Sequence, residues 1–108
     1  MEEIGRNESI RVVIDESGTV IAEGDIDLAG GPLLEAAILR RESSEPVVID
    51  LAKVEFIDSS GLRSLLGASR RANDRGTSVV LLRPSTGVMR LLAITGTTDQ
   101  FTVQGAEQ

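Results

Sequence analysis

The sequence predicts an α/β sandwich, in which a mixed β-sheet of four to five strands packs against about three helices. Two β-branched runs joined by a turn open the chain, an almost continuous apolar run lies near its middle, and segments with helical spacing separate the strands. Strands that alternate with helices are typical of a sheet covered by helices. Because 108 residues suffice for one core and not for two, we expect a single domain over residues 1–108, with flexible ends at 1–9 and 104–108.

The first part of the chain predicts a hairpin followed by a helix. Ile10–Ile14 and Thr19–Glu23 are rich in β-branched residues, and the turn-forming segment Asp15–Gly18 joins them. Pro32 suits the first turn of a helix, because its missing N–H would have no partner there. Apolar residues recur at helical spacing after this proline, so we expect a helix that ends near Ser43.

The middle of the chain predicts a central strand and a second helix. Val47–Leu51 is almost entirely apolar, which is typical of a strand that is buried on both faces and paired in parallel. Residues 52–57 are interpreted as a connecting loop with two apolar anchors, Phe56 and Ile57. An amphipathic helix is expected from Leu62 to Arg75.

The last part of the chain predicts one more strand, a helix and a short edge strand. Ser78–Leu82 is interpreted as the strand, and the helix follows Ser85 and ends at Gly96. Phe101–Val103 is expected to add the edge strand, and whether a final helix forms is left open. Gly67 is unfavourable inside the second helix, and we attribute it to close helix packing.

Composition excludes several classes of function. The chain has no cysteine and no histidine, so it contains no disulfide, no zinc site of the Cys/His type, no thiol nucleophile and no Ser-His-Asp triad. Its net charge of −6 and its 2% aromatic content argue against nucleic-acid partners and anionic membranes. No apolar run approaches the roughly 20 residues that span a bilayer, and the N-terminus does not resemble a signal peptide. We expect a cytoplasmic protein.

The sequence gives no positive sign of an enzyme, a metal site or a cofactor. Gly30, Gly31 and Pro32 lack the spacing and the lysine of a phosphate-binding loop. Asp25, Asp27 and Asp58 are carboxylates that could form a catalytic pair or hold magnesium, but their spacing does not indicate either. We therefore expect a binding protein rather than an enzyme.

The segment Asp58-Ser59-Ser60-Gly61 lies at the predicted start of the second helix and carries the most information about function. A serine at this position commonly caps the helix, which contributes about 1 kcal/mol. The same free N–H groups and the positive end of the helix dipole also accept a phosphate, so the serine is a suitable place for added charge. These residues alone favour the capping interpretation.

Longer motifs change this interpretation. The runs Val48–Leu51, Phe56–Leu62 and Leu65–Gly67 resemble the signature of the STAS domain family, and in particular that of its anti-sigma factor antagonists. The upstream run Gly24–Leu28 and the downstream run Arg83–Gly96 are similar to two further landmarks of this family. The resemblance extends over roughly residues 10 to 101 and implies a STAS-like sandwich.

The resemblance also implies a mechanism and a set of site residues. In this family an anti-sigma factor that is also a serine kinase binds the unphosphorylated antagonist, phosphorylates its first serine after the aspartate, and is then released; a serine phosphatase restores the serine. Carried over, Ser59 is the phosphorylation site. The implied partner-binding residues are Asp25, Asp27, Asp58, Ser59, Ser60, Gly61, Leu62 and Arg63.

Several alternatives stay open at the level of sequence. Asp27 could instead cap the turn before Pro32, and for Asp58 an N-cap is favoured over a direct partner contact. The chain could also be a STAS subunit of a stress-signalling scaffold or a STAS partner of a lipid transporter. The sigma factor and the oligomeric state are not predicted.

Overall fold

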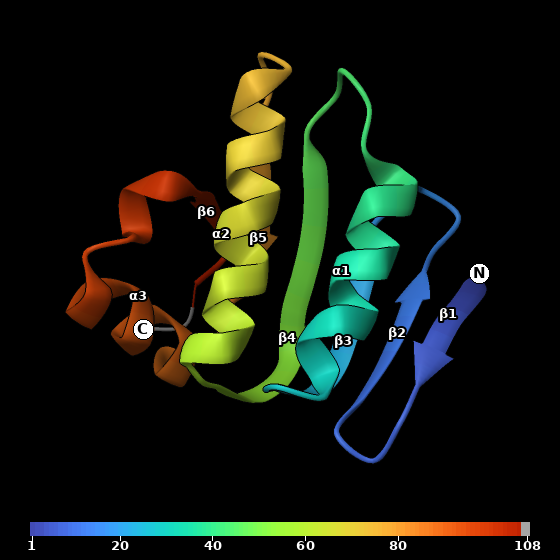
Figure 1. The fold of residues 1–108 in the computed structure, drawn as a ribbon, viewed down its shortest axis with the longest axis horizontal. Helices are drawn as coiled ribbons and strands as arrows, with labels where there is room; N and C mark the ends of the chain where they lie inside the picture. Colours follow the sequence, from blue (N-terminus) through green and yellow to red (C-terminus); the bar gives the residue numbers. More distant parts are fainter. Residues whose placement is uncertain (107–108) are drawn as a thin grey trace.

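The computed structural model describes residues 1–106 as one mixed sheet with three α-helices, which confirms the predicted α/β sandwich (Figure 1). The sheet has six strands, in the order β1-β2-β3-β4-β5-β6, rather than four to five. In chain order the elements are β1 (Glu2–Arg6), β2 (Ile10–Ile14), β3 (Val20–Ile26), α1 (Gly30–Arg41), β4 (Val47–Ile57), α2 (Ser59–Asp74), β5 (Val79–Leu82), α3 (Thr86–Thr95), a short 3₁₀ turn (Thr98–Gln100) and β6 (Thr102–Gln104).

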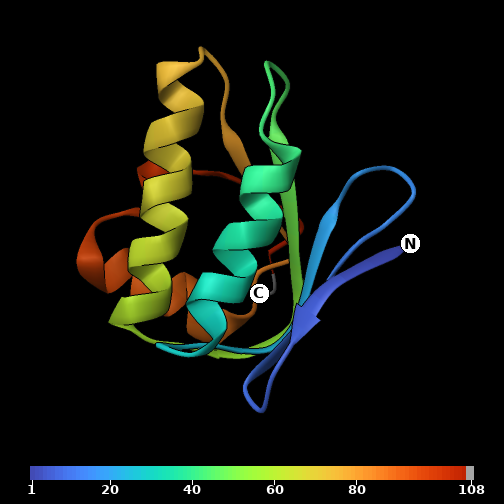
Figure 2. The same ribbon diagram turned by 45° about the vertical axis from the view of Figure 1, so that its right-hand side comes forward.

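The direction of the strands places the starts of all three helices at one edge of the sheet. The pairs β1–β2 and β2–β3 are antiparallel, whereas β3–β4, β4–β5 and β5–β6 are parallel. Helix α1 follows β3, α2 follows β4 and α3 follows β5, so each begins where a parallel strand ends. Helices α1 and α2 lie side by side on one face of the sheet, as Figure 2 shows together with Figure 1.

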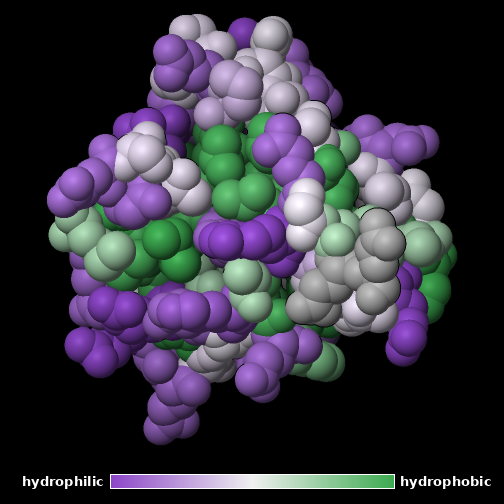
Figure 3. Space-filling view, turned by 180° about the vertical axis from the view of Figure 1, so that it is seen from behind, coloured by the Kyte–Doolittle hydropathy of each residue, from purple (hydrophilic) through white to green (hydrophobic). Residues whose placement is uncertain are grey.

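The core is aliphatic, as the composition requires. Helix α1 contributes Leu34 and Ile38, α2 contributes Leu65, and the central strand β4 contributes Ile49 and Leu51, all of them fully buried. The opposite face of the sheet carries no helix among residues 1–106, and Figure 3 shows apolar and charged side chains mixed on it. The helices therefore bury one face of the sheet, whereas the other face is covered only by the side chains of its own strands.

Two segments differ from the sequence-based expectations. Residues 2–6, which were expected to be flexible, form the edge strand β1, because they pair antiparallel with β2. Glu2 and Glu3 of this strand also form exposed ion pairs with Arg40 (2.7 Å) and Arg11 (2.8 Å). Residues 52–57, which were interpreted as a loop, continue β4, because β3 supplies a parallel partner along this length.

The remaining expectations concern the chain's last residues. The predicted edge strand after Phe101 is confirmed as β6, which pairs with β5. This strand includes Gln104, so the expectation of a flexible end at 104–108 is wrong for residue 104. Residues 107 and 108 of that expectation lie outside the described residues.

Candidate functional site

The candidate site is the edge of the sheet at which the parallel strands end and the helices begin. Asp27 follows β3, Asp58 and Ser59 follow β4, and Ser85 follows β5. Each helix N-terminus carries unpaired N–H groups and a partial positive charge of about half a unit. The edge therefore favours negative groups, and it holds a capping oxygen at each of the three positions.

Ser59 is the first residue of α2, and Asp58 is the residue that caps this helix. Asp58 Oδ1 accepts a hydrogen bond from the Gly61 N–H at 2.9 Å, with the extended backbone typical of an N-cap. Ser59 is exposed, and within residues 1–106 its hydroxyl makes no hydrogen bond. The favoured interpretation of Asp58 is thus confirmed, whereas the interpretation of Ser59 as a cap is wrong.

Asp27 has the corresponding role at the start of α1. Its Oδ1 accepts hydrogen bonds from the N–H groups of Gly30 (2.7 Å) and Ala29 (3.1 Å), and its Oδ2 accepts one from the Ser9 hydroxyl (3.1 Å). The hydrogen bond from Gly30, supported by those from Ser9 and Ala29, lowers the pKa of Asp27. Asp27 therefore holds the β3–α1 turn in shape, as the capping alternative proposed.

Close backbone contacts join the β3–α1 turn to the start of α2. The N–H of Asp58 donates to the Ile26 carbonyl at 3.3 Å. Gly61 lies so close to this carbonyl that a Cβ atom added to the glycine would be 1.9 Å from the oxygen. A Cβ on Gly31 of α1 would likewise be 2.9 Å from the Ser64 hydroxyl oxygen. The two glycines bring Asp27 and Ser59 to the same part of the surface.

The predicted partner-binding residues differ in their exposure. Ser59 and Arg63 are exposed, and Asp25, Asp27, Asp58 and Ser60 are half-buried, so all six can contribute to a docking surface. Gly61 and Leu62 are buried, with Leu62 4% exposed in the core, and their prediction as partner contacts is corrected. These two residues position α2 and expose little surface.

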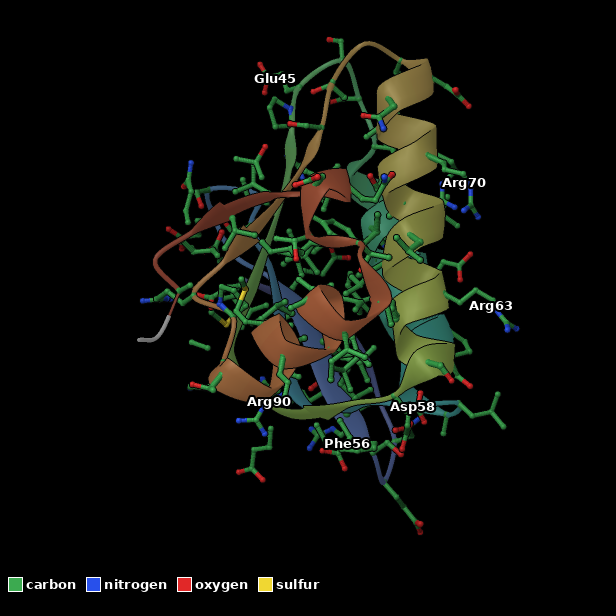
Figure 4. The ribbon with its side chains drawn as sticks, turned by 90° about the vertical axis from the view of Figure 1, so that its left-hand side faces the viewer. Glu45, Phe56, Asp58, Arg63, Arg70 and Arg90 are labelled. Atoms are coloured by element: carbon green, nitrogen blue, oxygen red, sulfur yellow. The ribbon has the colours of Figure 1, made fainter. Side chains whose placement is uncertain are left out.

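An apolar part of this edge was not expected from the sequence. Phe56 was predicted to be an anchor in the core, but it is 52% exposed, whereas its neighbour Ile57 is buried as predicted. Leu28, directly after Asp27, is 78% exposed. Figure 4 shows Phe56 and Asp58 along the lower edge of the molecule. An exposed aromatic three residues from Ser59 is a further candidate for the site.

Two other findings bear on the chemistry available to the described residues. Among residues 1–106 no group of three or more His, Cys, Asp or Glu side chains is arranged to hold a metal ion. In the same part of the chain no helix is long and apolar enough to cross a membrane.

Comparison with known proteins identifies the family. The family model described as "Mlab, STAS domain" matches residues 11–104. The chain belongs to the STAS domain family. The anti-sigma-B factor antagonist of Listeria monocytogenes is 30% identical over 105 residues, covering 92% of each chain, and that of Staphylococcus epidermidis is 31% identical over 96 residues, covering 86% of this chain and 89% of the relative.

Solved structures agree with this STAS assignment. An anti-sigma factor antagonist from Mycobacterium paratuberculosis superposes with a TM-score of 0.72 and 26% identity, covering 93% of this chain and 89% of that one. The similarity therefore extends over the whole sandwich, including the edge that carries Ser59.

Proposed function

We propose that this STAS protein is an anti-sigma factor antagonist in a partner-switching pathway. Its unphosphorylated form binds an anti-sigma factor that is also a serine kinase, and thereby releases the sigma factor. Phosphorylation of Ser59 abolishes this binding, and a serine phosphatase reverses it. The protein acts in the cytoplasm as a binding protein without catalytic activity of its own. The names of its relatives support the role, and the placement of one hydroxyl supports the mechanism.

The observation that carries the proposal is the free hydroxyl of Ser59. It is exposed at the first position of α2, and Asp58 rather than Ser59 supplies the cap. A kinase can therefore modify this hydroxyl without breaking a hydrogen bond of the fold. Ser60 is half-buried beside it, which makes Ser60 the poorer acceptor.

The charges around Ser59 explain why the phosphate acts on binding rather than on folding. The phosphate adds a charge of about −1.5 to −2. The α2 N-terminus stabilises it by about 0.3–1 kcal/mol, and Asp58 opposes it by about 0.7 kcal/mol per unit charge across about 6 Å of water. These effects nearly cancel in the free protein. When the complex forms, the phosphate must lose its hydrating water at the interface with the partner. A free-energy penalty of about 3 kcal/mol for this step weakens binding more than a hundredfold.

The direct test incubates the protein with ATP and the anti-sigma factor/serine kinase and locates the phosphate by mass spectrometry. We expect phosphate on Ser59 in the wild type and in the matched control Ser60→Ala, and none in Ser59→Ala, which still binds the kinase. Phosphate on Ser60, Thr77 or Ser85 would contradict the assignment of the site.

A pull-down from native lysate separates the proposal from its alternatives. A small kinase-like partner supports the antagonist. A very large particle would indicate a subunit of a stress-signalling scaffold, and a membrane complex would indicate a lipid-transporter partner. Equal affinities of the kinase for the phosphorylated and unphosphorylated forms would contradict the switch.

A further inference from the structure

A shallow apolar groove of about 260 Å³ lies beside Ser59 at the same edge of the sheet. One wall is the end of β4, and the other is a face of α3 on which residues recur at helical spacing. The groove is lined by Glu55, Phe56, Ile57, Gly87, Arg90, Leu91 and Ile94. Figure 4 shows Phe56 between Arg90 and Asp58, and Phe56, which lines the groove, is two residues before Asp58 at the start of α2.

The exposure of this groove's apolar side chains has no explanation within the fold. The chain has two aromatic residues, and Phe101 is 9% exposed in the core, whereas Phe56 is 52% exposed. Ile94, on the other wall, is 75% exposed, although Val88 and Leu92 of the same helix are buried. Large apolar side chains in water forgo the free energy that burial provides. Grouped in a groove, they indicate a surface that a partner covers.

The size of a typical protein interface shows how far a docking surface around Ser59 must extend. A stable complex buries about 800 Å² on each protein, which is more than the first turn of one helix presents. A partner that docks on Ser59 must therefore extend over its surroundings. Aromatic side chains in apolar pockets are the residues that contribute most to binding, and Phe56 is three residues from Ser59.

We propose that the docking surface for the anti-sigma factor extends from Ser59 over Phe56 into this groove. The groove buries an apolar side chain of the anti-sigma factor, and a neighbouring carboxylate of the anti-sigma factor pairs with Arg90. Arg90 forms no ion pair within residues 1–106, and Glu55 on the opposite wall repels a carboxylate, so the two charges fix the orientation of the inserted segment. This inference rests on the function proposed above.

The test measures the affinity of the purified anti-sigma factor/serine kinase for full-length variants by titration calorimetry. Phe56→Ser and Ile94→Ser should each weaken binding at least tenfold, and Arg90→Glu should do the same. The matched controls are Leu39→Ser, which changes a 50% exposed leucine in the last turns of α1, and Arg70→Glu, which changes an exposed arginine far along α2 (Figure 4). Both controls should bind within twofold of the wild type.

The possible outcomes separate this inference from the proposed function. If the wild type does not bind the anti-sigma factor, both are overturned. If the wild type binds and Phe56→Ser and Ile94→Ser behave like Leu39→Ser, the groove inference is overturned and the proposed function stands. Sedimentation adds a further outcome: a wild-type dimer that Phe56→Ser converts to monomers would assign the groove to a second copy of this chain. If Phe56→Ser does not fold, Ile94→Ser on α3 decides.

Discussion

Two glycines in α2 allow the packing of this helix to be tested by the same substitution with opposite expected signs. At Gly61 an added Cβ atom would lie 1.9 Å from the Ile26 carbonyl oxygen and 2.7 Å from both its carbonyl carbon and its Cγ2 atom. At Gly67 the single atom within 4 Å is Arg71 Nη1, at 3.4 Å, which is the tip of a flexible side chain. The first site touches rigid backbone, whereas the second is open.

The expected magnitudes follow from these contacts. Atoms in ordinary contact are about 3.5–4.0 Å apart, so Gly61→Ala must move α2 away from β3 by roughly 1.5 Å. Overpacking of this kind costs about 3 kcal/mol, and the better helix propensity of alanine returns about 1 kcal/mol. We expect a net loss of about 2 kcal/mol, or about 8–16 °C in melting temperature. Gly67→Ala should instead stabilise the protein by about 0.8–1 kcal/mol.

Urea denaturation followed by circular dichroism measures both changes, with thermal melts as a second observable. Loss of less than about 0.5 kcal/mol for Gly61→Ala would refute the argument that the backbone contact with Ile26 is rigid. A destabilised Gly67→Ala would contradict the expectation that this position is open. The same result would restore the sequence-based interpretation of Gly67 as a packing residue, which the open space beside it contradicts.

Three further predictions concern the site. Asp58→Ala should cost about 1 kcal/mol in urea denaturation because it removes the α2 cap, whereas Ser59→Ala should change stability by less than about 0.5 kcal/mol. Asp27→Asn should lower the melting temperature only slightly at pH 7, since it loses the charge but its amide oxygen still accepts from Gly30, and should weaken kinase binding. Because folding lowers the pKa of Asp27, its stabilising effect is present above the unfolded pKa of about 4 and is lost as pH falls below it, so acid should destabilise the wild type more than Asp27→Asn. After phosphorylation, Arg63 one turn along α2 should pair with the phosphate, so Arg63→Gln should raise the phosphate pKa by a few tenths of a unit in a ³¹P NMR titration, and no change would refute the pairing.

The sequence predicted the elements that are buried and regular. The helices have apolar residues that recur at helical spacing, the hairpin has β-branched runs joined by a turn, and the central strand is an almost continuous apolar run; the fold confirms these elements. Strand β1 was missed because Glu2-Glu3-Ile4-Gly5-Arg6 is mostly polar, and its attachment to the sheet comes from antiparallel pairing with β2, which the residue pattern does not reveal. The end of β4 was missed because its buried positions, Leu51, Val54 and Ile57, recur every third residue, which is not the alternation of a strand.

The candidate site was predicted in position but not in the exposure of each residue. The motif places Ser59 and Asp58 at the helix start, which the structure confirms. Membership in the motif does not distinguish residues that face solvent from residues that support them, so Gly61 and Leu62 were wrongly included. Phe56 was assigned to the core because it is apolar, and its residue type alone does not reveal that its side chain is 52% exposed.

The division of labour within Asp58-Ser59-Ser60-Gly61 explains how one hydroxyl can serve as a switch. The carboxylate of Asp58 caps the helix, and Gly61 lets the helix approach Ile26, so the two structural requirements of this turn fall on residues other than Ser59. If Ser59 itself supplied the cap, its phosphorylation would remove a hydrogen bond of about 1 kcal/mol and loosen the turn that presents it. Because it does not, the proposed switch predicts that the phosphate changes the stability of the complex far more than the stability of the free protein. A fold with a marginal stability of about 5–15 kcal/mol can then be modified and restored repeatedly without approaching unfolding.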